Sequence, residues 1–245
     1  MIKTSPKKTL VVVPARGGSK RIQGKNIKKI CGQPMIYWPL KTLSSIFHPR
    51  NILVSTDSAE IKIAVEAKGL EVPFMRPKNL SDDFTGTTEV VMHALEWYEN
   101  YVETVDYVLT VYPTSILLNS DDLKVAMKTL SEDIECDTIM SAAKFPVPPQ
   151  WAMFTNARNY AEMIEPKNFH VRSQDLKECF YDAAQFYLSK VSAIRKGTLL
   201  INSNVKLHML HQNNVVDIDT IEDFEIAEQK LKAHRNFDSN SDWSF

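Results

Sequence analysis

A segment with strand character runs directly into a basic, glycine-containing loop near the start of the chain. Residues 10–14, L-V-V-V-P, have the composition of a buried strand. The loop that follows, residues 15–26, contains the glycine pair Gly17-Gly18, the hydroxyl group of Ser19 and four cations: Arg16, Lys20, Arg21 and Lys25. Glycines let backbone N–H groups approach an anion, and cations neutralise it. Because open α/β sheets bind ligands at the carboxyl ends of their strands, the segment predicts a polyphosphate site.

The loop matches neither the ATPase pattern G-x-x-x-x-G-K-[ST] nor the dinucleotide pattern G-x-G-x-x-G. The alternative is a basic surface turn that happens to contain glycine. The strand before it and Lys25-Asn26 after it favour the polyphosphate interpretation.

Composition restricts the classes of function open to the chain. Its 245 residues are 44% hydrophobic and 24% charged, which is ordinary for a soluble globular protein with a sizeable core. The net charge of −1 argues against nucleic-acid binding, so the basic loop indicates a local ligand. We expect neither a membrane span nor a signal peptide. Because Cys31, Cys136 and Cys179 lack the spacing of a metal site or of disulfide partners, we expect a cytoplasmic protein.

Segments of strand and helix character alternate along most of the chain. This pattern is typical of an α/β fold with a Rossmann-like, doubly wound and mostly parallel sheet. Strands are expected at residues 10–14, 51–55, 107–112, 138–142, 183–188, 207–209 and 215–216, and helices at 34–45, 59–68, 87–100, 120–130 and 221–231. Ser58 is expected to cap the second helix, and Ser120 or Asp121 the fourth. We therefore expect one domain over residues 1–245.

The alternating pattern is interrupted after the fourth strand. Prolines are frequent at residues 144–149, and residues 150–171 lack clear helical periodicity. We expect residues 144–175 to form a small insertion of short strands and loops outside the main sheet. Residues 234–245 are rich in Asn, Asp and Ser and are expected to form a flexible tail.

Two aspartates late in the chain form a D-x-D motif. Alternation along a strand would place Asp217 and Asp219 on one face, with Ile218 directed into the core. Such a pair suits Mg²⁺, which proteins bind through one or two carboxylates together with substrate phosphates. The alternative is that Asp219 and Thr220 only cap the following helix. Asp223 is expected to serve the N-terminus of that helix.

The loop sequence A-R-G-G-S-K-x-I-x-x-K-N at residues 15–26 resembles the opening motif of the CMP-sialic acid synthetase (acylneuraminate cytidylyltransferase) family. The resemblance extends to about Leu231 and implies an α/β fold of the nucleotide-diphospho-sugar transferase type. It also implies transfer of CMP from CTP to a 2-keto sugar acid, with release of pyrophosphate. The nucleotide-binding residues that it implies in this loop are Ala15, Arg16, Gly17, Gly18, Ser19, Lys20, Lys25 and Asn26.

A second motif, R-P-x-x-L-x-x-D at residues 76–83, also matches the family. A guanidinium group can donate paired hydrogen bonds to O2 and N3 of cytosine. The resemblance makes Arg76 the reader of the base, with Leu80 and Ser81 supplying backbone contacts. The alternative is an Arg–Pro turn held by Asp82 or Asp83.

The sugar-binding segments match the family only in part. Sialic-acid members carry L-Q-P-T-S-P-L-R where this chain has V-Y-P-T-S-I-L-L at residues 111–118. The R-x-Q-D-L element at residues 172–176 retains an arginine that could grip a carboxylate through two hydrogen bonds. Residues 181–187, Y-D-A-A-Q-F-Y, resemble the Y-H-D-A-G-Q-F-Y of pseudaminic acid cytidylyltransferases. The implied sugar-binding residues are Tyr112, Thr114, Arg172, Gln174, Asp182, Gln185 and Phe186.

The segment at residues 181–187 also departs from that pattern. Ala184 stands where the pattern has a glycine. Because alanine is tolerated here only if the backbone φ is negative, we expect a negative φ at this position. Without the resemblance, we would interpret the segment as a strand with a buried polar pair.

The residues and the resemblance together predict a CTP-dependent cytidylyltransferase. Pseudaminic acid is the first choice of acceptor, legionaminic or sialic acid the second and Kdo the third. A sensor that binds CTP or a CMP-sugar without turnover is the alternative from another class. The predicted catalytic residues are Lys25, Arg16 and Asp219, and the family's D-I-D-T-x-x-D-F motif assigns Mg²⁺ to Asp217 and Asp219. By resemblance, the insertion would serve dimerisation or cover the sugar site, so a homodimer is expected.

Overall fold

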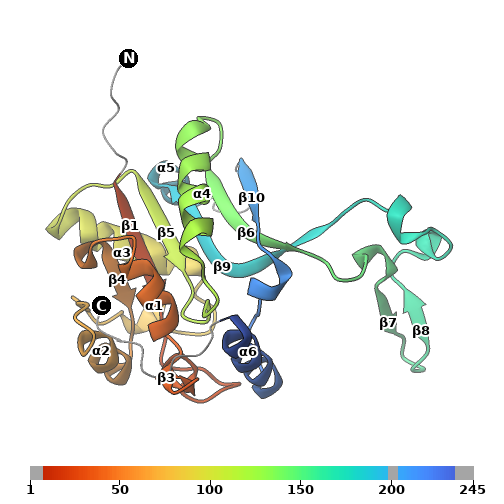
Figure 1. The fold of residues 1–245 in the computed structure, drawn as a ribbon, viewed down its shortest axis with the longest axis horizontal. Coiled ribbons are helices and arrows are strands. Elements are labelled where there is room, and N and C mark those ends of the chain that lie inside the picture. The colour runs from red at the N-terminus through yellow and green to blue at the C-terminus, as the bar shows by residue number, and fades with distance from the viewer. Residues whose placement is uncertain (1–7, 198–203, 235–245) are drawn as a thin grey trace.

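The protein, described by a computed structural model over residues 8–197 and 204–234, is built around a six-stranded sheet (Figure 1). Across the sheet the strands are β10 (Val205–Met209), β6 (Thr138–Lys144), β9 (Phe180–Lys190), β5 (Tyr107–Val111), β1 (Thr9–Pro14) and β4 (Ile52–Ser55). β4, β1 and β5 pair in parallel, as do β6 and β10. Only β9 among them is antiparallel to its neighbours. The sheet is therefore mostly parallel, as predicted.

The first strand shows why helices cover both faces of the sheet. Val11 and Val13 belong to one hydrophobic cluster, whereas Leu10 and Val12 belong to another. The helices on the first face are α1 (Tyr37–Ser44), α2 (Ala59–Glu66) and α4 (Ser120–Glu132), and those on the second are α3 (Thr87–Tyr101) and α5 (Val191–Arg195). A strand buried on both faces has to be apolar throughout, which explains the run at residues 10–13. This arrangement confirms the doubly wound fold.

A third hydrophobic cluster joins the end of the chain to the segment beside the basic loop. α6 (Ile221–His234) contributes Phe224 and Leu231 to this cluster, and they pack with Ile22 and Trp38. The short strands β2 (Lys29–Ile30) and β3 (Gln33–Pro34) form a hairpin in the same region. The cluster brings the connection before α6, which carries the two predicted metal-binding aspartates, next to the basic loop. Within the described residues, every helix is too short or too polar to span a lipid bilayer.

Residues 145–179 leave the sheet between β6 and β9 and project from it (Figure 1); we call this segment the arm. Within it, β7 (Met153–Thr155) and β8 (Ala161–Met163) pair as a separate antiparallel hairpin. Large hydrophobic residues are exposed along the arm: Val147, Met153, Phe154, Tyr160, Ile164 and Phe169. The short strands and loops expected at residues 144–175 lie here. The expected tail lies, apart from His234, outside the described residues.

Two local expectations are wrong. Residues 215–216 are not a strand, because a tight turn at residues 212–214 redirects the chain after β10 and the next residues pair with no described strand. α4 is capped by Asn119 rather than by Ser120 or Asp121: the Asn119 side chain accepts a hydrogen bond from the Asp121 N–H at 2.8 Å. The expected cap of α2 is confirmed, since the Ser58 hydroxyl accepts a hydrogen bond from the Ile61 N–H.

The expectation for Ala184 is also wrong. Its φ is 49°, in the left-handed region that favours glycine. Here the pairing of β9 with β6 shifts its register, and the Ser141 hydroxyl accepts hydrogen bonds from the Gln185 and Phe186 N–H groups at 3.2 and 3.0 Å. The Ala184 N–H donates to Asp182 Oδ1 at 2.8 Å. The bulge therefore imposes the glycine conformation although the chain carries alanine.

Candidate functional site

A cavity of about 310 Å³ opens at the carboxyl ends of β1 and β5. This is the place where the sequence predicts a polyphosphate site. The cavity brings together seven of the predicted site residues: Arg16, Lys25, Asn26, Arg76, Leu80, Tyr112 and Thr114. They come from the basic loop, from the connection that precedes α3 and from the loop that follows β5.

The backbone of the basic loop is fixed against the connection between β4 and α2. The Ala15 N–H donates to the Ser55 carbonyl at 2.9 Å, and the Gly17 N–H donates to Asp57 Oδ1 at 2.8 Å. A Cβ atom on Gly17 would lie 2.8 Å from Ser58 Cβ, so only glycine allows this approach. The loop is therefore held in one shape by the neighbouring strand end.

Each cation of the basic loop is paired with an aspartate. The ion pairs are Arg16 and Lys20 with Asp83, and Arg21 and Lys25 with Asp219. The Lys25 side chain is 20% exposed, the least of the four cations, and its Nζ also donates to the Ile218 carbonyl at 2.6 Å. Asn26 is buried and donates to the Arg16 carbonyl at 2.9 Å. Lys25 and Asn26 are thus held at the base of the cavity, whereas Lys20 lies at its exposed rim.

Arg76 lies in the cavity wall and is almost fully buried, at 7% exposure. Its Nη2 donates to the Ser55 carbonyl at 2.7 Å and its Nη1 to the Leu80 carbonyl at 3.5 Å. Backbone oxygens therefore hold this guanidinium, rather than Asp82 or Asp83. Its Nε is buried and has no partner in the described part of the chain. Burial lowers the pKa of Arg76, although the nearby Asp57 opposes that shift.

The two predicted metal-binding aspartates flank a buried isoleucine. Ile218 is fully buried in the cluster beneath α6, as expected, although Asp217 and Asp219 lie in an irregular segment rather than a strand. Desolvation and then the charge of Asp219 raise the pKa of Asp217, which shows that the two carboxylates repel one another. Asp223 accepts hydrogen bonds from the N–H groups of Asp219 and Thr220 at 3.1 and 2.8 Å, so it serves the N-terminus of α6 as predicted. The Thr220 hydroxyl accepts from the Asp223 N–H at 3.2 Å, so Thr220 caps the same helix, as the alternative expected.

This pair of carboxylates fits a magnesium ion. Among the described residues, no group of three or more acidic, His or Cys side chains is placed to hold a metal. Mg²⁺ needs no such cage, because one or two carboxylates and substrate phosphates complete its shell. A cation at Asp217 and Asp219 would also relieve their mutual repulsion.

Two tyrosines and an aspartate form a connected cluster beside the cavity. Tyr112 Oη lies 2.8 Å from Thr87 Oγ1, and the Tyr112 and Tyr187 rings meet edge to face at 6.0 Å. Tyr187 donates its phenol hydrogen to Asp182. Burial raises the pKa of both phenols, so both stay protonated at neutral pH.

The neighbouring predicted sugar-binding residues, Gln185 and Phe186, lie in the core rather than in the cavity wall. Both are buried, and Gln185 Nε2 donates to the Asn214 carbonyl. Phe186 packs in the hydrophobic cluster beneath β5 and β9. The bulge at Ala184 directs both side chains into the core, so they pack behind the site and do not line the cavity.

Arg172 and Gln174 are not brought to the cavity at all. Both lie on the arm, where Arg172 Nε pairs with Asp175 at 2.8 Å in an exposed position. Gln174 lines a different cavity, of about 370 Å³, at the base of the arm. The predicted carboxylate clamp is therefore separate from the nucleotide cavity within this chain.

Four residues of the site were missing from the sequence-based set: Asp57, Asp83, Thr87 and Tyr187. Asp57 follows the second strand, so its place at a strand end was a usable signal. Asp83 and Thr87 lie in residues 81–88, S-D-D-F-T-G-T-T, and the sequence motif suggested Asp83 only as an alternative partner of Arg76.

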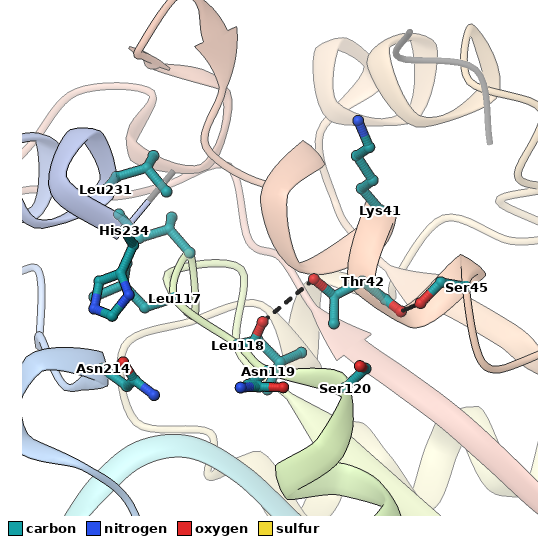
Figure 2. A pocket seen from close by; sticks show the side chains of 11 residues that line it. Lys41, Thr42, Ser45, Leu117, Leu118, Asn119, Ser120, Asn214, Leu231 and His234 are labelled. Carbon is teal, nitrogen blue, oxygen red and sulfur yellow. Dashed lines mark hydrogen bonds between the residues drawn. The ribbon is translucent and has the colours of Figure 1, made fainter. Parts of the chain in front are cut away.

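Figure 2 shows another cavity, of about 390 Å³, between α1, the loop after β5 and the end of α6. Lys41 and His234 are among its lining residues, and the Leu118 carbonyl accepts a hydrogen bond from Thr42 Oγ1 at 3.3 Å. It is larger than the cavity at the basic loop, but none of the predicted site residues lines it. Its size alone does not make it the candidate site.

The chain belongs to the cytidylyltransferase family, whose model matches residues 10–230, and it is therefore a nucleotidyltransferase. It is 36% identical to the pseudaminic acid cytidylyltransferase of Campylobacter jejuni subsp. jejuni serotype O:2, over 93% of this chain and 97% of that protein. It is 24% identical to the CMP-N,N'-diacetyllegionaminic acid synthase of Legionella pneumophila, over 92% of this chain and 97% of the relative. These matches confirm the family that the motifs indicated.

Solved structures confirm the fold class. CMP:2-keto-3-deoxy-manno-octonic acid synthetase complexed with CTP matches with a TM-score of 0.67 at 16% identity, over 93% of this chain and all of that one. The 4-diphosphocytidyl-2C-methyl-D-erythritol synthase of Anaerococcus prevotii matches with a TM-score of 0.61 at 14% identity, over 92% and 99%. At these identities the likeness concerns the fold alone.

Proposed function

We propose that this chain transfers CMP from CTP to a nonulosonic acid, with pseudaminic acid as the preferred acceptor. The observation that carries the proposal is the match to a pseudaminic acid cytidylyltransferase over nearly the whole of both chains. The cluster of Tyr112, Tyr187 and Asp182 supports the choice of sugar, because these positions are where the chain departs from the sialic-acid pattern. The protein acts in the cytoplasm under this proposal, where CTP is available.

The nucleotide would occupy the cavity at the basic loop. Arg16 and Lys20 suit the outer phosphates, and Lys25 with Asn26 the α-phosphate and the ribose. The unpartnered Nε of Arg76 supports a role near the base, since a buried donor without an acceptor is unfavourable. Its Nη groups already bond to the backbone, so this residue also shapes the wall that the base would contact.

The anomeric hydroxyl of the sugar acid loses its proton to solvent, and its oxygen forms a bond to the α-phosphorus. The bond from that phosphorus to the oxygen between the α- and β-phosphorus breaks, and that oxygen leaves with pyrophosphate. Lys25 is placed to stabilise charge at the α-phosphate, and Arg16 and Lys20 the charge that develops on the leaving pyrophosphate. Asp217 and Asp219 would hold Mg²⁺, which neutralises phosphate oxygens when bound. If Asp219 binds Mg²⁺ instead of pairing with Arg21 and Lys25, these two cations become available to bind phosphate.

The arm supports a homodimer in which each chain completes the sugar site of the other. Its exposed hydrophobic residues lack cover in a single chain, and such patches mark protein–protein interfaces. Arg172 lies on the arm and not at the cavity of its own chain. A partner's arm could supply this arginine to the carboxylate of the sugar acid.

The test is pyrophosphate release with CTP and Mg²⁺ in the presence of pseudaminic, N,N'-diacetyllegionaminic, N-acetylneuraminic or Kdo acid. We expect release with CTP but not UTP, abolished by a chelator, and fastest with pseudaminic acid. Faster release with another acid would overturn the sugar and keep the reaction. Binding of CTP without release with any acid would favour a sensor.

A further inference from the structure

Asp83 occupies a distinctive place at the rim of the cavity. Its Oδ1 lies 2.8 Å from Arg16 Nη1, and its Oδ2 pairs with Lys20 Nζ. One carboxylate thus bridges two cations through its two oxygens, as a phosphate group would. Among the described residues, these two cations are the only partners of the Asp83 side chain.

The preceding residue fixes the backbone that carries Asp83. Asp82 Oδ1 accepts hydrogen bonds from the Phe84 N–H at 3.0 Å, from the Thr85 N–H at 2.7 Å and from the Thr85 hydroxyl at 2.8 Å. The Asp82 carbonyl also accepts from Arg16 Nη1 at 3.3 Å. The turn therefore holds the Asp83 carboxylate opposite the basic loop, and rotation of one side chain is enough to withdraw it.

We propose that Asp83 competes with the outer phosphates for Arg16 and Lys20, and thereby promotes the release of pyrophosphate after transfer. This inference rests on the proposed placement of the triphosphate in the cavity. Before CTP binds and after pyrophosphate leaves, Asp83 satisfies both cations. While the outer phosphates are bound, the same carboxylate is displaced.

The exposure of the three groups sets the strength of this competition. Arg16 and Asp83 are about two-fifths exposed and Lys20 more so, and exposed ion pairs of this kind are individually weak. CTP also contacts the base and α-phosphate side of the cavity, so it can displace Asp83. Free pyrophosphate has only the outer cations, so it is the ligand that Asp83 opposes most effectively.

Asp219 does not share this role. It also pairs with two cations, but Asp217 is its neighbour in the proposed metal site, and a bound cation would keep it at the nucleotide. Asp83 lies outside that pair and belongs to the turn before α3. The two aspartates therefore favour different steps: Asp219 favours binding of the nucleotide, and Asp83 favours release of pyrophosphate.

The test is the affinity of full-length wild-type protein and Asp83→Asn for pyrophosphate in the presence of Mg²⁺, measured by titration calorimetry. Loss of two exposed ion pairs should tighten binding about fivefold to tenfold. CMP, which lacks outer phosphates, should bind both proteins equally. Asp121→Asn is the matched control, because Asp121 is an exposed partner of Lys124 on α4, away from the cavity. It should leave the pyrophosphate affinity unchanged.

Unchanged or weaker pyrophosphate binding by Asp83→Asn overturns the inference, and so does an equal gain by Asp121→Asn. Asp83→Ala provides a second variant, and thermal unfolding confirms that both remain folded. The product-inhibition constant of pyrophosphate should fall by the same factor as the dissociation constant. Direct binding needs no sugar acid, so failure of the proposed reaction and failure of this role are separate results.

Discussion

The cavity region and the arm are held in place by different means. At the cavity, the basic loop follows a strand buried on both faces and is fixed by hydrogen bonds from Ala15 and Gly17 to the end of β4 and the residues that follow it. The arm contains a hairpin of two three-residue strands among turns and loops, with apolar side chains exposed along it. One region is anchored by hydrogen bonds within a single chain, whereas the other exposes apolar side chains there.

This difference separates two parts of the proposed reaction. The groups proposed for phosphate and for metal converge within one chain. The basic loop lies at the end of a parallel strand, and the hydrophobic cluster beneath α6 brings Asp217 and Asp219 next to it. The arginine proposed for the sugar carboxylate is located on the arm, and in the proposed homodimer it would act in the site of a second chain. Chemistry and sugar recognition should therefore respond to different mutations.

The largest effect is expected at the cavity. Asp219→Ala removes a proposed metal ligand that also pairs with Arg21 and Lys25. We expect kcat to fall about 10²-fold to 10³-fold, because the metal no longer stabilises the charge that develops in the transition state. Much of the CTP affinity should be retained. Steady-state kinetics and CTP titration measure the two quantities. Turnover at the wild-type level would exclude Asp219 as a metal ligand.

The second effect is expected on the arm. Arg172→Ala should raise KM for the sugar acid about tenfold or more and leave CTP binding unchanged, because a paired contact to a carboxylate is lost. Lys167→Ala, on the same arm and exposed, is the matched control.

Mixing two impaired variants then tests whether the site is shared. A heterodimer of Asp219→Ala and Arg172→Ala subunits contains one site with both residues intact if the arm reaches the partner. Activity should therefore rise above that of either variant alone when the proteins are mixed after dissociation. A mixture with only the sum of the separate activities would place Arg172 outside the partner's site.

Patterns set by local physics were predictable from the sequence. The apolar run at residues 10–13 indicated a strand covered on both sides, and the hydroxyl of Ser58 capped α2 as expected. The D-x-D motif placed Ile218 in the core even though the segment proved irregular, because burial of one apolar side chain does not need a strand. Family motifs located the cavity because they lie where strand ends meet.

Features set by distant contacts were not predictable. The direction of Gln185 and Phe186 depends on a bulge whose hydrogen bonds come from Ser141 on another strand. The pairing of Asp83 with the basic loop joins residues more than 60 positions apart. No periodicity or local motif in one sequence encodes such contacts.

The bulge at the junction of arm and sheet gives a third prediction. Ala184→Gly should raise the free energy of unfolding by about 0.5–1 kcal/mol, because φ of 49° is unfavourable for a residue with a Cβ atom. The expected rise in Tm is about 1–4 °C. Ala183→Gly is the matched control: this buried neighbour lacks a positive φ and should be destabilised instead. Loss of stability in both variants would show that the bulge does not strain Ala184.

The smallest effect concerns Asp217, whose carboxylate is destabilised first by burial and then by the charge of Asp219. Because the pKa of Asp217 is raised in the folded protein, its charged form is unfavourable there at pH values above that pKa, and the penalty disappears as the pH falls and the carboxyl group is protonated. Asp217→Asn should therefore raise Tm by about 1–2 °C at pH 7.5 without Mg²⁺, but not near pH 3.

Repeating this measurement with Mg²⁺ distinguishes a metal-binding role of Asp217 and Asp219 from a purely structural one. In the wild-type protein, Mg²⁺ together with CTP should raise Tm, since the ligands bind only the folded state, and Asp217→Asn should lose most of that increase. Differential scanning fluorimetry with and without Mg²⁺ separates the two effects. A variant that is less stable than wild type at pH 7.5, or that keeps the full Mg²⁺-dependent increase, would show that the carboxylate pair serves the fold of this segment rather than a cation.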